Sequence, residues 1–116
     1  MKNLQKTNNN FIVAIDQINN SKTLLPFILY NKMELFAEHA ALPFKDFIVS
    51  KPNLSKLNIL RNAFLNDRLI LKSQVKKLSP TELELTIEVV RKNKDDIICN
   101  ALFNFTLDNF QVNIAS

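Results

Sequence analysis

The 116-residue chain contains no glycine, and only one cysteine and one histidine. Without glycine it has no phosphate-binding loop, no dinucleotide-binding glycine motif and no Gly-x-Ser-x-Gly nucleophile elbow. Asparagine is the best substitute where the backbone needs a positive φ angle. We therefore expect several asparagines to occupy turns, among them Asn19, Asn20, Asn66, Asn93 and Asn109.

The single cysteine and the single histidine limit the possible metal chemistry. Cys99 cannot form a disulfide framework or a Cys-x-x-Cys metal pair, and its place in an apolar run predicts a buried, inert thiol. His39 cannot build a metal site without carboxylate partners, so it is either a proton shuttle or an ordinary surface or interface histidine. We expect no metal and no cofactor.

Long apolar runs and charge clusters are also missing. No run approaches the ~20 residues that a membrane span needs, and the polar N-terminus has no signal-peptide core. We therefore expect a cytoplasmic protein without a membrane partner. The net charge of +4 is scattered rather than gathered in a stripe, which does not favour nucleic-acid binding. It fits a solvated surface or an anionic ligand such as coenzyme A.

The length and the 47% hydrophobic content suit one folded unit. We expect a flexible tail over residues 1–9 and a single domain over residues 10–116. The core of such a domain is small, so a dimer would be a natural way to cover more apolar surface.

Residues 23–43 predict the only long helix. At 100° per residue one face is apolar, as for a helix that packs on a sheet, and it consists of Leu29, Met33, Phe36, Ala37 and Ala40. Ser21 or Thr23 could cap this helix, and Pro26 is acceptable in its first turn. Glu34 falls at the edge of the apolar face, where core gives way to solvent or to a partner.

The rest of the chain predicts strands. They are expected at residues 11–15, 53–60, 68–78, 82–90 and 97–107. The clearest alternation places Leu83, Leu85, Ile87 and Val89 inward and the intervening polar side chains outward. In the last strand Ile97 and Cys99 are expected to begin the inward set. The predicted fold is α+β, with one curved antiparallel sheet around the helix.

This order of elements resembles the hot-dog fold of the acyl-CoA thioesterase superfamily, which includes proteins like 4-hydroxybenzoyl-CoA thioesterase. In that family the stretch before the third strand commonly contains Phe-x-x-Pro-x-x-x-Gly-Asp. The same spacing here holds Ile59, Asn62, Asn66 and Asp67, so the aspartate is kept and Asn66 can adopt the glycine's turn. The resemblance extends from Phe11 to the end of the last strand.

The resemblance implies a thioester hydrolase for acyl-CoA or acyl-carrier-protein substrates. The family's catalytic carboxylate is either an acid on the central helix, matched by Glu34, or an aspartate after the first strand, matched by Asp16. Residues implied for substrate binding are Asn19, Asn20, Leu24, Leu25, Tyr30 and Phe64. The amides near Leu24 and Leu25 would serve as donors to the thioester carbonyl, and Tyr30, Phe27 and Phe64 would line an acyl channel.

Several alternatives stay open. Glu34 could be an ordinary solvated helix carboxylate, and Asp16 an ordinary turn aspartate. The family's helix usually begins with a glycine whose amide polarises the carbonyl, and this chain has none, which favours a non-catalytic protein that binds acyl thioesters. A 3-hydroxyacyl thioester dehydratase is a further possibility, although no histidine precedes the helix. The resemblance also implies a homo-oligomer, either a dimer or a dimer of dimers.

Overall fold

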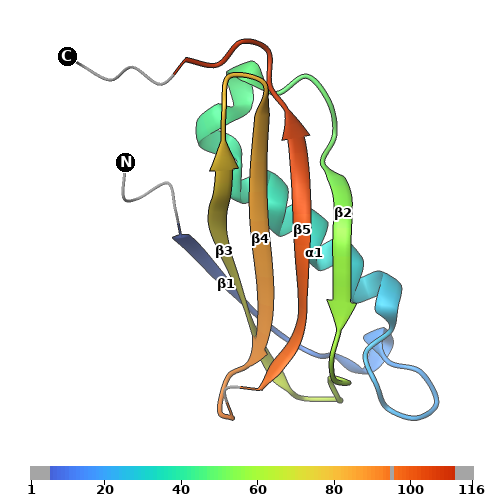
Figure 1. The fold of residues 1–116 in the computed structure, drawn as a ribbon. Coiled ribbons are helices and arrows are strands. Elements are labelled where there is room, and N and C mark those ends of the chain that lie inside the picture. Colours follow the sequence, from blue (N-terminus) through green and yellow to red (C-terminus); the bar gives the residue numbers. More distant parts are fainter. Residues whose placement is uncertain (1–5, 95, 112–116) are drawn as a thin grey trace.

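The computed structural model describes residues 6–94 and 96–111, and it shows one long helix lying against one face of a five-stranded sheet (Figure 1). In chain order the elements are β1 (Lys6–Ile12), the short 3-10 helix η2 (Ile15–Gln17), α1 (Pro26–Ala40), the 3-10 helix η3 (Leu42–Phe47), β2 (Asn53–Ile59), β3 (Arg68–Leu78), β4 (Glu82–Arg91) and β5 (Ile97–Thr106). The predicted α+β class is confirmed.

The sheet is antiparallel throughout, with the strand order β1-β3-β4-β5-β2. Consecutive strands β3, β4 and β5 form a meander. The strands β1 and β2 lie at opposite edges, so the chain must cross the sheet between them. Helix α1 makes this crossing and covers the inner face (Figure 1).

The inner face of α1 is the one that the sequence predicts. Its buried residues are Leu29, Met33, Phe36, Ala37 and Ala40, and they pack into a single core with the inward side chains of the sheet. The start of the helix differs from the prediction, because α1 begins at Pro26 and neither Ser21 nor Thr23 caps it. A residue before proline is disfavoured in the helical region, and Leu25 is indeed extended, with ψ 133°.

The alternation in the strands predicts the core well except at one bulge. Leu83, Leu85, Ile87 and Val89 are all buried, as expected. In β5, however, Ile98 is buried and Ile97 is only half-buried, which corrects the predicted inward position of Ile97. The register shifts between Val89 and Val90 where β4 meets β5, and such a bulge breaks the strict period of two.

The first strand begins earlier than predicted. Residues 6–12 pair with β3 from Lys6↔Gln74 to Ile12↔Arg68, whereas residues 13–15 lie outside the strand. Residues 6–9 therefore belong to the sheet and not to a tail, and residues 1–5 of the expected tail lie outside the described residues. The asparagines here have low strand propensity, which pairing with an adjacent strand overrides.

Asparagines fill two of the three positions with positive φ among the described residues. Asn66 has φ 71° and Asn109 has φ 54°, which confirms that asparagine takes the place of glycine in these turns. The third position is Lys22, with φ 64°, in the turn before the helix.

Candidate active site

Glu34 lies in the third turn of α1 and is half-buried at the edge of the apolar face. Tyr30, one turn earlier, donates its hydroxyl to Glu34 Oε2 at 3.3 Å. The Tyr30 ring lies 6.3 Å from that of Phe103 in β5. Burial, the Glu34 charge and the hydrogen bond to Glu34 together raise the pKa of Tyr30 above 10, so its hydroxyl remains a donor at neutral pH. The carboxylate is thus held in place by a neighbour on its own helix.

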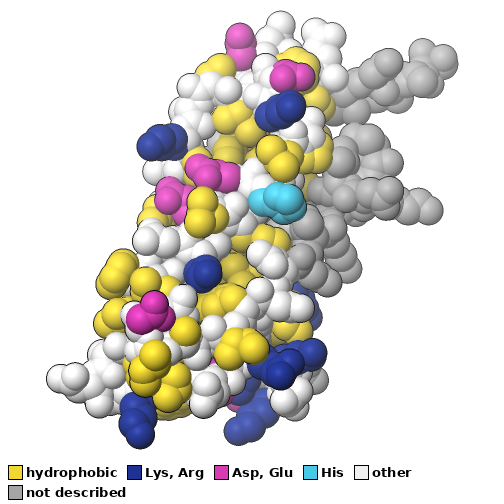
Figure 2. Space-filling view, turned by 180° about the vertical axis from the view of Figure 1, so that it is seen from behind, with side chains coloured by type: hydrophobic (Ala, Val, Ile, Leu, Met, Phe, Trp, Pro, Cys, Tyr) yellow, Lys and Arg dark blue, Asp and Glu magenta, His cyan; other side chains and the backbone are white. Residues whose placement is uncertain are grey.

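The side of α1 that carries Glu34 faces the β2 edge of the sheet. Glu38, one turn further, borders a groove of about 440 Å³. The opposite wall of this groove is the segment before β2, and the lining residues are Ile48, Val49, Ser50, Lys51, Pro52 and Phe105. The groove lies beside the helix and opens to solvent, and its helix residue Glu38 stands one turn after Glu34. Figure 2 shows the helix-bearing face, with acidic side chains near its middle among exposed hydrophobic ones.

The segment before the helix forms a small hairpin, residues 18–24, which we call the pre-helix hairpin. Ile18 pairs with Leu24 in an isolated antiparallel bridge. Asn19 Oδ1 accepts the amides of Ser21 at 2.9 Å and Thr23 at 3.1 Å. These two bonds fix the orientation of the Asn19 side chain and leave its NH₂ group available as a donor. Within one chain the hairpin lies at the N-terminal end of α1 (Figure 1), whereas Glu34 belongs to the third turn of that helix.

The amides at the helix start are arranged differently from the prediction. The Leu24 amide donates to Ala63 O at 2.8 Å, and the Leu25 amide donates to Gln17 O at 2.9 Å. Neither is free for a substrate carbonyl, which corrects the expected donor role of both residues. Over the described chain the Phe27 amide has no acceptor, as is normal in a first helical turn.

The remaining predicted residues lie in separate places. Asp16 is exposed in η2 and has no hydrogen bond or ion pair within the described residues. Asn20 is exposed in the pre-helix hairpin. Phe64 is exposed in the β2–β3 loop, 5.9 Å from the Arg91 guanidinium, whereas Tyr30 packs beside the sheet. The structure therefore brings Tyr30 and Glu34 together but does not join them to Asp16 or Phe64 in one chain.

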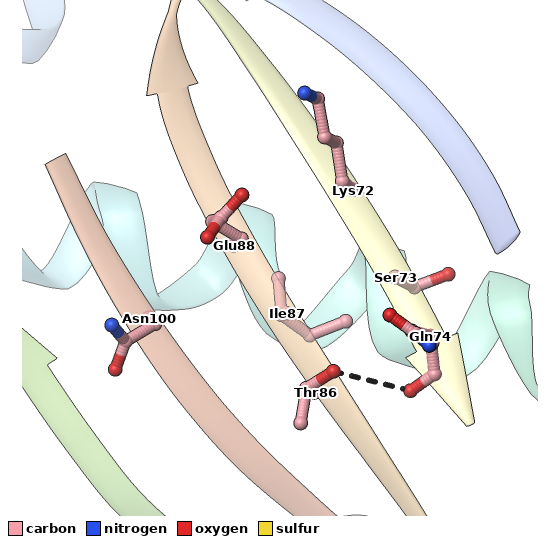
Figure 3. A pocket seen from close by; sticks show the side chains of 7 residues that line it. All are labelled: Lys72, Ser73, Gln74, Thr86, Ile87, Glu88 and Asn100. Carbon is pink, nitrogen blue, oxygen red and sulfur yellow. Dashed lines mark hydrogen bonds between the residues drawn. The ribbon is translucent and has the colours of Figure 1, made fainter. Parts of the chain in front are cut away.

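A second depression lies on the opposite, open face of the sheet and has a volume of about 290 Å³ (Figure 3). Lys72, Gln74, Glu88 and Asn100 are among its lining residues, and Thr86 donates to Gln74 O at 3.3 Å. This depression is separated from Glu34 by the sheet itself and has few apolar side chains. It does not suit an acyl chain.

Two further observations describe the chemistry of the chain. No cluster of three or more metal-ligating side chains occurs within residues 6–94 and 96–111, and no helix there is long and apolar enough to span a bilayer. Cys99 is buried, lies 3.5 Å from Met33 Sδ, and has its pKa raised by burial to about 12. Its thiol therefore stays protonated, as the sequence predicts for an inert cysteine.

Comparison with known proteins gives a clear structural result. No family model and no curated protein matches the chain. Among solved structures, an acyl-CoA hydrolase from Staphylococcus aureus, in complex with butyryl coenzyme A, coenzyme A and coenzyme A disulfide, matches with a TM-score of 0.76 and 15% identity over 88% of this chain. The chain spans only 62% of the length of that hydrolase.

Two further structures agree with the first. Zebra fish thioesterase superfamily member 2 matches with a TM-score of 0.76 and 15% identity over 89% of this chain and 75% of its own. A hypothetical thioesterase protein with coenzyme A from Streptococcus pneumoniae matches with a TM-score of 0.74 and 15% identity over 93% and 82%. The chain therefore has the hot-dog fold of thioesterase superfamily structures, as the sequence resemblance implied.

The sequence carries no signal for the groove beside Glu38 or for its residue Ser50. A serine close before Pro52 in a short polar run carries no signal of its own, because such runs are ordinary loops. Only the packing of this loop against α1 shows that it borders the same side of the helix as Glu34.

Proposed function

We propose that the protein is a thioester hydrolase for acyl-CoA or acyl-carrier-protein substrates, with Glu34 as the assisting carboxylate. The observation that supports this most directly is the placement of Glu34. It is half-buried on the central helix of a hot-dog fold, held by Tyr30, and one helical turn before Glu38, which borders the groove. A fixed carboxylate beside a groove can activate water for attack on a thioester carbonyl.

In the proposed reaction Glu34 accepts a proton from a water molecule whose oxygen bonds to the thioester carbon. The carbonyl oxygen becomes negatively charged and needs donors, for which the free Phe27 amide and the Asn19 NH₂ group are available. The C–S bond then breaks, and the thiolate takes up the proton from Glu34. The products are a free thiol and a carboxylic acid, which releases its proton to water at neutral pH.

One chain cannot place all of these groups around one carbonyl. Phe27 and Glu34 are seven residues apart, which is about 10 Å along a helix at ~1.5 Å per residue. We therefore propose a homodimer paired through the β2 edges, or a dimer of such dimers, in which the pre-helix hairpin of one copy approaches Glu34 of the other. Support comes from the β2 side, where Leu57, Ile59 and Leu60 are exposed at an unpaired strand edge.

Spacing in the sequence supports the same residues. One structure of the S. aureus hydrolase carries alanine in place of an asparagine. Another carries alanine in place of an aspartate, which lies fifteen positions after that asparagine. Asn19 and Glu34 are also fifteen positions apart. In the S. pneumoniae thioesterase an aspartate and a threonine sixteen positions later are replaced in the same way. Sixteen positions after Glu34 stands Ser50, in the groove. In the S. aureus hydrolase the replaced threonine lies seventeen positions after the aspartate, so this spacing supports Ser50 less directly than it supports Glu34.

The test is thiol release from a panel of acyl-CoA esters. We expect turnover by the wild type and a loss of about 100-fold or more in Glu34→Gln, the usual range for a missing general base. Glu88→Gln, which changes a carboxylate on the open face of the sheet, is the matched control and should keep full activity. No release above background, with wild type and Glu34→Gln indistinguishable, would contradict the proposal.

A second candidate is a non-catalytic protein that binds acyl thioesters. It is favoured by the helix start, where the Leu24 and Leu25 amides are already bonded within the chain and no glycine is present. Tight binding of coenzyme A esters by calorimetry, without release of thiol, would select this function over hydrolysis.

A further inference from the structure

We propose that Arg91 is a positioning residue, which together with Asp67 fixes the 62–67 loop and, through it, the pre-helix hairpin that carries Asn19. This inference rests on the proposed function, because it assigns the hairpin a role at the reacting carbonyl. Arg91 is the last residue of β4, and no pattern in the sequence distinguishes it.

Arg91 holds the 62–67 loop at two points. Its Nη1 forms an ion pair with Asp67 Oδ2, and its Nη2 donates to Asn62 O at 3.0 Å. The Arg91 side chain is only 12% exposed, and its ion pair with Asp67 is partly buried, whereas its bond to Asn62 O lies at the surface. Asp67 Oδ2 also accepts the Phe64 amide at 2.8 Å. A guanidinium fork that engages both ends of a loop fixes its shape more firmly than a single contact.

The 62–67 loop in turn holds the pre-helix hairpin. The Leu24 amide donates to Ala63 O at 2.8 Å, and the Leu65 amide donates to Lys22 O at 3.1 Å. Thr23 of the hairpin also forms an isolated antiparallel bridge with Phe64 of the same loop. The loop therefore helps to fix the hairpin relative to the sheet. Arg91 and Asp67 hold the loop together with two backbone hydrogen bonds, from the Val13 amide to Asp67 O at 3.0 Å and from the Asn66 amide to Val13 O at 2.9 Å.

The position of the hairpin determines where Asn19 would lie relative to the thioester carbonyl in the proposed reaction. The hairpin lies at the end of the molecule (Figure 1), where its hydrogen bonds to the loop add to the packing of Leu24 in the core. A displacement of about 1 Å in a group that contacts the reacting centre can lower a rate by about 100-fold. Loss of the Arg91 fork should therefore reduce turnover more than it reduces substrate binding.

The experiment compares wild type, Arg91→Lys and Arg91→Met. Lysine keeps the charge but cannot make both contacts. In Arg91→Met we expect kcat to fall by about 10–100-fold, with KM changed by less than about 3-fold. The kcat of Arg91→Lys should lie between those of wild type and Arg91→Met. In parallel, hydrogen exchange at the hairpin amides should accelerate in both variants, while the β4–β5 amides keep their protection.

The matched control is Ile87→Val, which removes one methyl group from the core of β4 without touching the loop. It should lower stability but leave kcat and hairpin exchange unchanged. Unchanged hairpin exchange in Arg91→Met, or an equal loss of kcat in Ile87→Val, would overturn the positioning role. Absence of thiol release in the wild type would instead count against the proposed function, while the exchange data still decide whether Arg91 holds the hairpin.

Discussion

Tyr30 is the only tyrosine in a chain without tryptophan, so its ionisation can be followed directly by near-ultraviolet absorbance. Burial, followed by the charge and hydrogen bond of Glu34, raises the pKa of Tyr30 above 10. The folded state therefore favours the neutral phenol. The resulting stability is fully present below pH ~10 and is lost as the pH rises through the raised pKa.

This environment leads to a prediction about the Tyr30–Glu34 pair. In Glu34→Gln the titration midpoint of Tyr30 should fall, because the carboxylate charge is gone. It should stay above 10, because burial, the largest cause, is unchanged. Glu88→Gln should leave the midpoint where it is. An identical midpoint in wild type and Glu34→Gln would show that the two side chains do not interact in solution.

At the scale of single residues, the sequence could locate Glu34 at the edge of the apolar face but could not show its contact with Tyr30. Helical periodicity places both side chains on adjacent turns, which is enough to make contact possible. Whether a hydroxyl donates to a carboxylate depends on rotamers, and these are set by the packing of Tyr30 beside Phe103.

At the scale of elements, helix α1 has two faces with opposite roles. Phe36 is 2% exposed in the core, and its neighbour Leu35 is 64% exposed on the outer side. The two residues are adjacent in the middle of the helix, and the helix propensities of ordinary residues differ by less than about 0.7 kcal/mol. Any large difference between their substitutions must come from burial.

We expect Phe36→Ala to lower the free energy of unfolding by about 3–5 kcal/mol, because it removes buried surface and leaves a cavity. Leu35→Ala should change it by less than about 0.5 kcal/mol. Urea unfolding followed by circular dichroism measures both values. Equal losses in the two variants would mean that Leu35 is covered in solution, as it would be in an assembly through the outer face of the helix.

The boundaries of elements were harder to predict than their existence. The strands at β3, β4 and β5 follow from alternation, since one face of each is buried. The bounds of β1 do not follow, because its asparagine-rich residues join the sheet only through pairing with β3. The start of α1 at Pro26, which the sequence placed too early, depends on the contacts that hold residues 23–24 against the 62–67 loop.

At the scale of the whole molecule, the two edges of the sheet offer a matched comparison. Ile59 in β2 and Ile12 in β1 are both 52% exposed and both lie at the end of an edge strand. They differ only in which edge they occupy. The proposed function requires pairing through the β2 edge, next to the side of α1 that carries Glu34.

We expect Ile59→Lys to convert the dimer to monomers in light scattering at micromolar concentration and to reduce thiol release in parallel, because a charge on an edge strand opposes pairing. Ile12→Lys should leave both the mass and the activity unchanged. A wild type that is monomeric, or an active monomeric Ile59→Lys, would contradict a site shared between two copies.

The sequence by itself determined the fold class, the inner face of the helix and the use of Asn66 as a turn residue, because each depends on local periodicity or on the backbone freedom of one residue. Only the tertiary structure decided which amides are free at the helix start and that Arg91 reaches Asp67 from twenty-four positions away. The same is true of the groove, which Ser50 and Glu38 line together. The physical reason is that these contacts join distant segments, and no local pattern encodes the geometry that packing imposes on them.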